Sequence, residues 1–354
     1  MRVVVYAIAK NEEKFVNRWV NSMKEADAIY VLDTGSTDKT VEKLKENGVF
    51  VKTKKIKPWR FDVARNISLE MIPDKFDIYV CTDLDEILLP GWRKKLEKNW
   101  KKNTTRAKYT YNWKLENNKP VISFYYDKIH IRKNYKWIHP VHEILQYNGT
   151  ENYVIIDDII LNHYPDISKS RSNYLNLLEL SIKENPNDDR NMHYLGREYM
   201  YHKKWNKCID TLIKHLNLPT ALWKDERCAS MRFIARSYKN LNRIEEAELW
   251  LKKAISEAPY LRDPWIELGL LEYENNNYES AIFYIEEALK INTRNKTYIN
   301  EVFSWNETPY DILSICYFNI KNFNKSLENI NIALSINSNN ERLINNKKII
   351  ESEL

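Results

Sequence analysis

The residues best suited to chemistry are two aspartates, Asp83 and Asp85, which follow the apolar run at 78–81. Such a run predicts a buried strand, and carboxylates just after a strand lie where ligands bind in open α/β sheets. In a regular strand, residues two positions apart point to the same face. A hard divalent cation takes one or two protein carboxylates and completes its shell with diphosphate oxygens. The pair therefore predicts a site for a metal-bridged nucleotide, although an acidic turn that caps the next helix is the plainer alternative.

The residues before this pair predict the elements that would position it. Residues 2–9 and 28–32 are apolar and rich in β-branched residues, which indicates buried strands, and 49–51 is a third short strand. Between them, 13–24 carries an apolar helical stripe and 39–47 forms a second helix. Strands alternating with helices indicate a parallel α/β unit with right-handed crossovers. Its polar loops meet at one edge, which is the expected nucleotide pocket.

Arg65 precedes the acidic strand and is the first cation of interest. A guanidinium can clamp a diphosphate through two parallel hydrogen bonds. A surface ion pair with Asp62 is the alternative, and such a pair contributes little.

Four short motifs then occur in order: Ala-Lys-Asn-Glu-Glu at 9–13, Asp-Thr-Gly-Ser-Thr-Asp-Lys-Thr at 33–40, Phe-Asp-Val-Ala-Arg-Asn at 61–66 and Asp-Leu-Asp-Glu at 83–86. Together they resemble family 2 glycosyltransferases of the GT-A fold, over residues 1 to about 165. The resemblance implies a UDP-sugar donor and Mn²⁺ or Mg²⁺. It also implies that Asp83 and Asp85 hold the metal.

The resemblance gives the other motif residues roles as well. The residues expected to contact the nucleotide-sugar are Ala9, Asn11, Glu12, Asp33, Arg65, Asp83 and Leu84. Close relatives usually have alanine at position 84, so Leu84 is expected to narrow the sugar pocket. Arg65 is expected beside the diphosphate.

Three aromatic strands are predicted after these motifs, at 107–115, 121–126 and 128–132, with a hairpin turn at Asn117-Asn118. They resemble the acceptor side of such a domain. Their aromatic residues alternate, so one face is core and the other could stack on a sugar.

A second group of titratable residues, His139, His142 and Glu143, follows Trp137. An inverting transferase needs one group to take the acceptor's proton, and Glu143 can do this, with His142 as neighbour or base. Relatives carry Val-His-Glu at this point, but here the glycine that often precedes it is absent. His163 ends the last predicted strand and is the expected third metal ligand, with a structural role as the alternative.

The sequence changes character at about residue 170, where a helical repeat begins. Small residues recur at Gly196, Ala235, Gly269 and Ser314, and Ala235 and Gly269 are 34 positions apart. The spacing resembles tetratricopeptide repeats, whose concave surface binds peptides or subunits. Four repeats with a polar C-terminal helix are predicted. The expected domains are therefore a GT-A domain at 1–168 and a tetratricopeptide-like domain at 169–354.

Composition limits the remaining classes. The chain of 354 residues carries a formal charge of +6, which is modest for a nucleic-acid-binding protein, although lysines at 51–57 and 93–102 leave an anionic partner open. Four separated cysteines predict neither a zinc nor a redox motif and fit a reducing compartment. No apolar run approaches the ~20 residues that span a bilayer. A cytoplasmic protein is expected.

The sequence thus predicts a metal-dependent, inverting glycosyltransferase that moves a hexose, with glucose favoured, from a UDP-sugar. The acceptor stays open between a peptide, as in the similar sublancin-type S-glycosyltransferases, a glycan, as in lipooligosaccharide glucosyltransferases, and a modified DNA base. A homodimer through the repeats is a further expectation. The alternative is a repeat scaffold with an inactive transferase domain.

Overall fold

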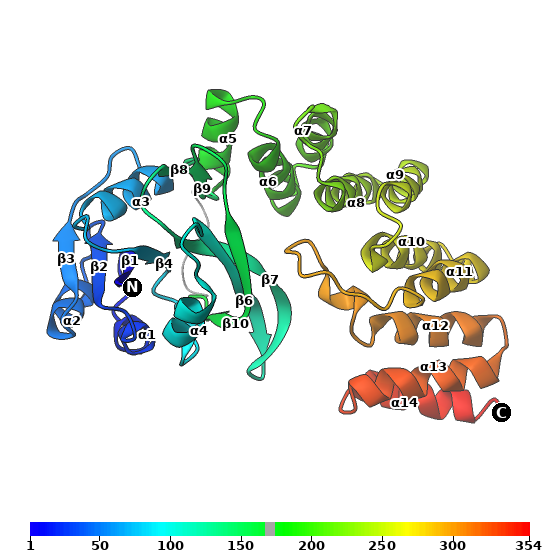
Figure 1. Cartoon of the computed structure of the whole chain (residues 1–354). Coiled ribbons are helices and arrows are strands. Elements are labelled where there is room, and N and C mark those ends of the chain that lie inside the picture. The colour runs from blue at the N-terminus through cyan, green and yellow to red at the C-terminus, as the bar shows by residue number, and fades with distance from the viewer. Residues whose placement is uncertain (167–173) are drawn as a thin grey trace. The chain divides into compact units, whose positions relative to one another are not determined.

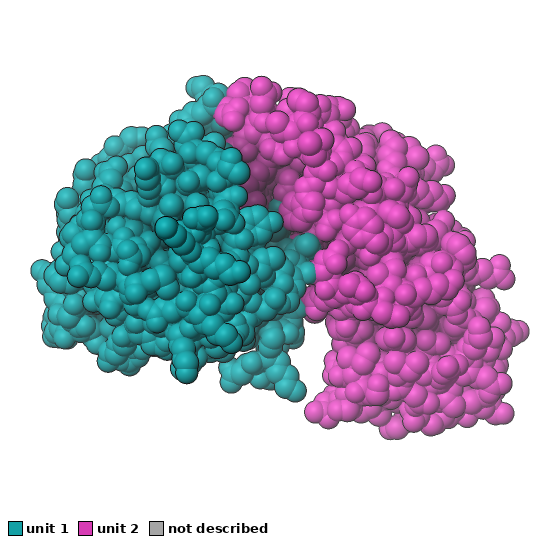
Figure 2. Space-filling view, in the orientation of Figure 1, with its two compact units in different colours: residues 1–184, 296–298 teal, residues 185–295, 299–354 magenta. Residues whose placement is uncertain are grey.

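The computed structural model describes residues 1–166 and 174–354. They form two compact units, one of residues Met1–Glu184 with Lys296–Tyr298 and one of Asn185–Asn295 with Ile299–Leu354 (Figure 2). The predicted domain boundary at 168/169 lies outside the described residues. In those residues, no helix is both long and apolar enough to cross a membrane.

The first unit is built on an eight-stranded mixed sheet in the order β3-β2-β1-β4-β7-β6-β10-β5 (Figure 1). The strands of this sheet are β1 Val3–Ala9, β2 Ala28–Asp33, β3 Phe50–Thr53, β4 Ile78–Cys81, β5 Glu86–Leu88, β6 Arg106–Glu116, β7 Lys119–His130 and β10 Tyr153–His163. Strands β1 to β4 pair in parallel, as their sequence pattern predicts. Strand β7 runs antiparallel to both β4 and β6. A separate hairpin joins β8 Tyr135–Ile138 to β9 Ile144–Tyr147.

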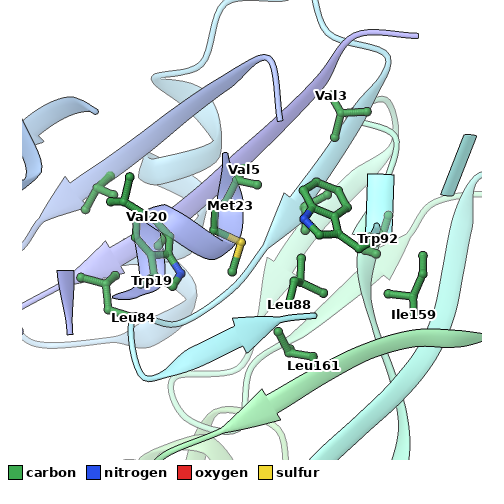
Figure 3. Close-up of a cluster of buried hydrophobic side chains, with 14 of the residues drawn as sticks. Val3, Val5, Trp19, Val20, Met23, Leu84, Leu88, Trp92, Ile159 and Leu161 are labelled. Atoms are coloured by element: carbon green, nitrogen blue, oxygen red, sulfur yellow. The ribbon is translucent and has the colours of Figure 1, made fainter. Parts of the chain in front are cut away.

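The helices of this unit are α1 Val16–Met23, α2 Thr40–Glu46, α3 Phe61–Glu70, α4 Trp92–Asn99 and α5 Tyr174–Glu184. The predicted stripe of α1 is buried and packs in the largest core cluster, together with Trp92 of α4 and residues of β1, β5 and β10. Figure 3 shows Leu84 among the buried side chains of this cluster.

The two aromatic strands predicted at 121–126 and 128–132 are one strand, β7, so that prediction is wrong. The pairing with β6 jumps from Tyr109–Tyr126 to Ala107–Ile129, so two residues of β7 oppose one of β6. This irregularity is a β-bulge, which bends a strand and re-aims its side chains without ending it. The predicted turn is confirmed, since Asn117 and Asn118 both have positive φ, at 50° and 60°.

The second unit is helical. Its helices are α6 Asp189–Tyr201, α7 Trp205–Asn217, α8 Lys224–Asn240, α9 Ile244–Glu257, α10 Arg262–Glu274, α11 Tyr278–Leu289, α12 Thr308–Asn319, α13 Phe323–Ile336 and α14 Glu341–Glu351, with a short 3₁₀ turn at Val302–Ser304. Consecutive helices pack as pairs, α6 with α7, α8 with α9, α10 with α11 and α12 with α13, and α14 follows the last pair. This arrangement matches the four predicted repeats and the C-terminal helix.

Two glycines let the paired helices approach closely. A Cβ atom on Gly269 would lie 2.5 Å from Cγ1 of Ile285, and one on Gly196 would lie 2.2 Å from Cδ2 of Leu212. Both distances are far below van der Waals contact, so neither position accepts a side chain unless the neighbouring side chain or its helix moves.

We therefore expect Gly269→Val to lower the free energy of unfolding of the second unit by about 1–3 kcal/mol, through overpacking. Ser256→Val, at an exposed position of α9, is the matched control and should change it by less than about 0.5 kcal/mol. Urea denaturation measures both. Adding Ile285→Ala to Gly269→Val should recover part of the lost stability, because it removes the side chain that the new valine contacts. If the two single changes simply added, a clash between positions 269 and 285 would be contradicted.

Candidate active site

The loops after β1 and β2 are bound to each other at the edge of the sheet. The side-chain carbonyl of Asn11 accepts the amide N–H of Thr37 at 2.8 Å, and the N–H of Asn11 donates to Oγ of Ser36 at 2.9 Å. Asn11 has φ of 55°, a conformation that asparagine tolerates. The carbonyl of Ala9 accepts the N–H of Thr34. The two motif loops thus form one ordered surface, as expected of a nucleotide-binding edge.

Asp33 and Glu12 belong to the same surface. Asp33 is buried, and its carboxylate accepts the backbone N–H groups of Gly35 and Ser36 at 3.2 and 3.1 Å. The N–H of Glu12 donates to Oγ1 of Thr40 at 2.7 Å. The Asp33 carboxylate therefore orders the turn that the sequence motif marks.

Arg65 of α3 lies at the centre of the site and is almost fully buried. Its Nη2 lies 2.5 Å from Oδ1 of Asp83, and its Nε lies 2.9 Å from Oε1 of Glu143. The guanidinium thus holds together two carboxylates from distant parts of the sequence. The alternative surface pair with Asp62 is not formed, because Asp62 pairs with Arg60 at 2.9 Å. The position of Arg65 beside a diphosphate stays a prediction.

Lys128 is a second buried cation, which sequence reasoning missed. Its Nζ lies 3.5 Å from Oδ2 of Asp83, and its side chain is 7% exposed. The β-bulge in β7 places it there. Burial alone would raise the pKa of Asp83, but the charges of Arg65 and Lys128 hold that pKa well below its usual range.

Asp85 is bound differently. Its Oδ2 lies 3.3 Å from Nε2 of His163, and these two side chains are 26% and 15% exposed. The Nδ1 of His163 lies 3.0 Å from the carbonyl oxygen of Trp113, so Nδ1–H donates and Nε2 faces Asp85. Burial lowers the pKa of His163, but the Asp85 carboxylate outweighs burial and the net shift is upward.

Strand β4 ends at Cys81, two residues before the aspartates, so both lie in a turn rather than in a regular strand. The side chain of the residue between them, Leu84, is 2% exposed and lies in the core cluster (Figure 3). This placement corrects the expectation that the Leu84 side chain narrows a sugar pocket, because only its backbone can face the site.

Glu86 is a buried acid beneath the turn. Its Oε2 accepts the N–H of Asp83 at 2.8 Å. Burial and the charge of Asp83 raise the pKa of Glu86 to about 7. The sequence motif contained this residue, but its burial could not be read from the motif.

The predicted metal ligands are not assembled as one cluster. Across 1–166 and 174–354, no three histidines, cysteines or acidic residues are close enough together to hold a metal ion. Asp83 is bound to two cationic side chains, whereas Asp85 and His163 face each other and are partly open. An oxygen and a nitrogen ligand fit a divalent cation that takes its remaining ligands from a diphosphate. The residues present therefore fit a two-ligand site better than the predicted three-ligand one.

Glu143 and His142 lie in the loop between β8 and β9. The Glu143 side chain is 10% exposed and one of its oxygens is bound by Arg65. His142 takes φ of 50° and His139 takes φ of 77°, so histidines adopt the left-handed conformations that a glycine would favour. The His142 ring lies 5.8 Å from that of Tyr174 in α5. The loop is further held by Phe61, whose N–H donates to the carbonyl of Pro140.

Comparison with known proteins agrees with this architecture. Residues 4–149 match the model of Glycosyl transferase family 2. The N-terminal unit carries a family 2 glycosyltransferase domain. The match spans the nucleotide-binding edge, Arg65, both aspartates and Glu143, and it confirms the resemblance on which the sequence interpretation depended.

The helical unit is similar to tetratricopeptide-repeat proteins. Residues 233–260 and 263–295 match a Tetratricopeptide repeat model. A crystal structure of MamA is 18% identical with a TM-score of 0.40, and the match covers 51% of this chain and 99% of that one. YrrB, described as a TPR protein with an unusual peptide-binding site, is 12% identical with a TM-score of 0.39, and the match covers 50% of this chain and 83% of that one. No curated protein matches the chain.

Proposed function

We propose that the protein transfers a hexose, with glucose favoured, from a UDP-sugar to an acceptor with inversion at the anomeric carbon. The observation that carries the proposal is the grouping of Asp85, His163, Asp83, Arg65 and Glu143 in a family 2 glycosyltransferase domain. Acidic, basic and imidazole groups meet beside the ordered loops at the ends of β1 and β2. A scaffold with an inactive domain would not need such a set.

In this proposal, Asp85 and His163 hold Mn²⁺ or Mg²⁺. The bound cation would supply positive charge to the departing diphosphate, where negative charge grows in the transition state. Asn11, Glu12, Asp33 and the backbone at Ala9 form the surface for the nucleoside.

Glu143 takes the proton of the acceptor group as that group attacks the anomeric carbon, with His142 as its neighbour. Arg65 is a positioning residue in this scheme, because it binds one carboxylate oxygen of Glu143 and leaves the other for the acceptor. By holding Asp83 as well, it fixes the turn that carries Asp85.

The repeat unit is proposed to bind the acceptor or a partner protein, and a homodimer through the repeats stays a prediction. The acceptor classes remain peptide, glycan and modified DNA base. The cytoplasmic location likewise stays a prediction.

The test is release of UDP from UDP-glucose by the full chain, with Mn²⁺ and with a chelator. We expect Asp85→Asn to reduce metal-dependent release roughly 100-fold or more, since a metal supplies several kcal/mol of charge stabilisation. Asp158→Asn, at an exposed aspartate of β10, is the matched control and should be unaffected. A wild-type protein that neither binds nor hydrolyses a UDP-sugar would favour the scaffold alternative.

A further inference from the structure

A pocket of about 390 Å³ lies at the open ends of β6 and β10, beside the β6–β7 turn. It is lined by Trp113, Lys114, Leu115, Asn117, Asn118, His163, Tyr164 and Pro165. Of these residues, only His163 belongs to the candidate active site. A concave site with a few polar groups at an apolar wall is the usual form of a small-ligand site.

The chemistry of the wall fits a sugar ring. Trp113, a large aromatic residue near the hairpin end of β6, is 39% exposed. Its indole stacks at 22° and 6.4 Å on the His163 ring, so the aromatic surface is held in place. A pyranose presents a face of C–H groups that packs on an indole, and its hydroxyls bond to amides such as those of Asn117 and Asn118.

Two other acceptor classes fit the same wall less well. An extended peptide commonly binds as an added strand, but β6 is already paired with β7 as far as Glu116, and with β10 as far as Asn112, so only the last four residues of one edge of β6 could accept a strand. A nucleic acid strand needs a basic groove, and the pocket's Lys114 pairs with Glu116 at 2.7 Å.

The position of the pocket indicates whether it binds the donor sugar or a sugar of the acceptor. In the sheet order, β6 lies three strands from β1, or about 14 Å at ~4.8 Å per strand, so the pocket is separate from the nucleoside loops. His163 forms part of its wall and faces Asp85 with its other nitrogen. A ring held against Trp113 therefore lies next to the candidate cation ligands, on the side away from the nucleoside.

We propose that this pocket binds a sugar ring of the acceptor, so that the acceptor is a carbohydrate. The inference rests on the proposed function, because only a glycosyltransferase has an acceptor. Binding of a sugar to this pocket can nevertheless be measured without any nucleotide.

The experiment measures saturation-transfer NMR between the full chain and methyl β-glucopyranoside, lactose and cellobiose, with a serine- and cysteine-containing peptide and a single-stranded oligonucleotide as comparison probes. At least one saccharide should bind, and Trp113→Ala should weaken that binding roughly tenfold or more, whereas Trp113→Phe should retain most of it. Trp223→Ala removes a tryptophan of similar exposure, 42%, from the other unit and should leave saccharide binding unchanged.

Three results would overturn the inference: no saccharide binding, equal binding by wild type and Trp113→Ala, or binding of only the peptide or oligonucleotide. Displacement of the saccharide by UDP-glucose but not by UDP would assign the pocket to the donor sugar and also overturn it. Failure of the proposed function gives a different result, which is absence of UDP-glucose binding and hydrolysis in the wild type whether or not a saccharide binds.

Discussion

Replacing Arg65 with methionine should lower the free energy of unfolding of the first unit by about 3–5 kcal/mol, the cost of leaving buried charges without their partner. Methionine roughly preserves the length of the side chain but removes the charge. The carboxylate of Glu143 then loses its cation, and Asp83 keeps only Lys128, at 3.5 Å. The Glu143 side chain, which is 10% exposed, must then be desolvated in the folded state without its guanidinium partner, whereas Asp83, at 34% exposed, keeps part of its hydration. Hydrogen exchange of peptides from the first unit, measured in urea, reports this loss separately from the repeats.

Arg60→Met is the matched control for this substitution. Arg60 also binds two carboxylates, those of Asp62 and Glu184, but its side chain is 23% exposed. The Arg60–Glu184 pair is exposed and should contribute about 0–1 kcal/mol, and Asp62, although 11% exposed, also accepts the backbone N–H of Val63, so the control should lose less stability than Arg65→Met. Combining Arg65→Met with Glu143→Gln should cost less than the sum of the two single changes, because the second removes a charge that the first leaves unpaired. Equal losses for Arg65→Met and Arg60→Met would show that the central network contributes no more than a surface pair.

Much of the architecture follows from local sequence patterns. Alternation of apolar strands with amphipathic helices predicts the parallel strands β1 to β4, and the Asn117-Asn118 pair predicts the hairpin because asparagine tolerates positive φ. The repeat of small residues predicts the helix pairs, and the contacts of Gly196 and Gly269 give the physical reason. These features depend on residues close in sequence or on a fixed period, so the chain alone contains the signal.

The interior of the site could not be predicted in the same way. Arg65 and Glu143 are 78 positions apart, and only the folded sheet brings them within hydrogen-bond distance. The direction in which the Lys128 side chain points depends on the β-bulge in β7. This bulge arises from the pairing of β7 with β6, and the propensities of single residues do not predict it. Leu84 turns into the core because β4 ends early, at Cys81. Motifs therefore identified most of the residues, whereas tertiary pairing decided which side chains meet.

Acidification should destabilise both units through one buried, neutral histidine in each. Burial lowers the pKa of His130 in the first unit and of His193 in the second to about 3, from an ordinary value of 6.5. Between these values the unfolded chain binds a proton that the folded chain excludes, so the free energy of unfolding falls as the pH falls from about 6.5 toward 3. At pH 5 the expected loss is about 2 kcal/mol for each histidine, relative to neutral pH.

The surroundings of His193 make it the better site for a test. Its Nδ1 lies 2.7 Å from Oγ of Ser230, which in turn lies 3.0 Å from Nδ1 of His215, and both histidines are fully buried. The charged groups that act on its pKa besides His215 are Glu226, Arg197 and Arg190. Glu226 alone favours the protonated ring, and burial with the three basic residues outweighs it.

We expect His193→Asn to be less stable than wild type at pH 7.5 but to lose about 2 kcal/mol less on transfer to pH 5, because asparagine has no proton to bind. His202→Asn is the control, because it removes a 43% exposed histidine from the same helical unit, and it should change the pH dependence of stability far less than His193→Asn does. Hydrogen exchange of peptides from the second unit at both pH values gives the free energies. The prediction is contradicted if the stabilities of wild type and His193→Asn depend on pH in the same way. In that case the folded state would bind a proton on His193 as readily as the unfolded state does, and this histidine would not contribute to acid destabilisation.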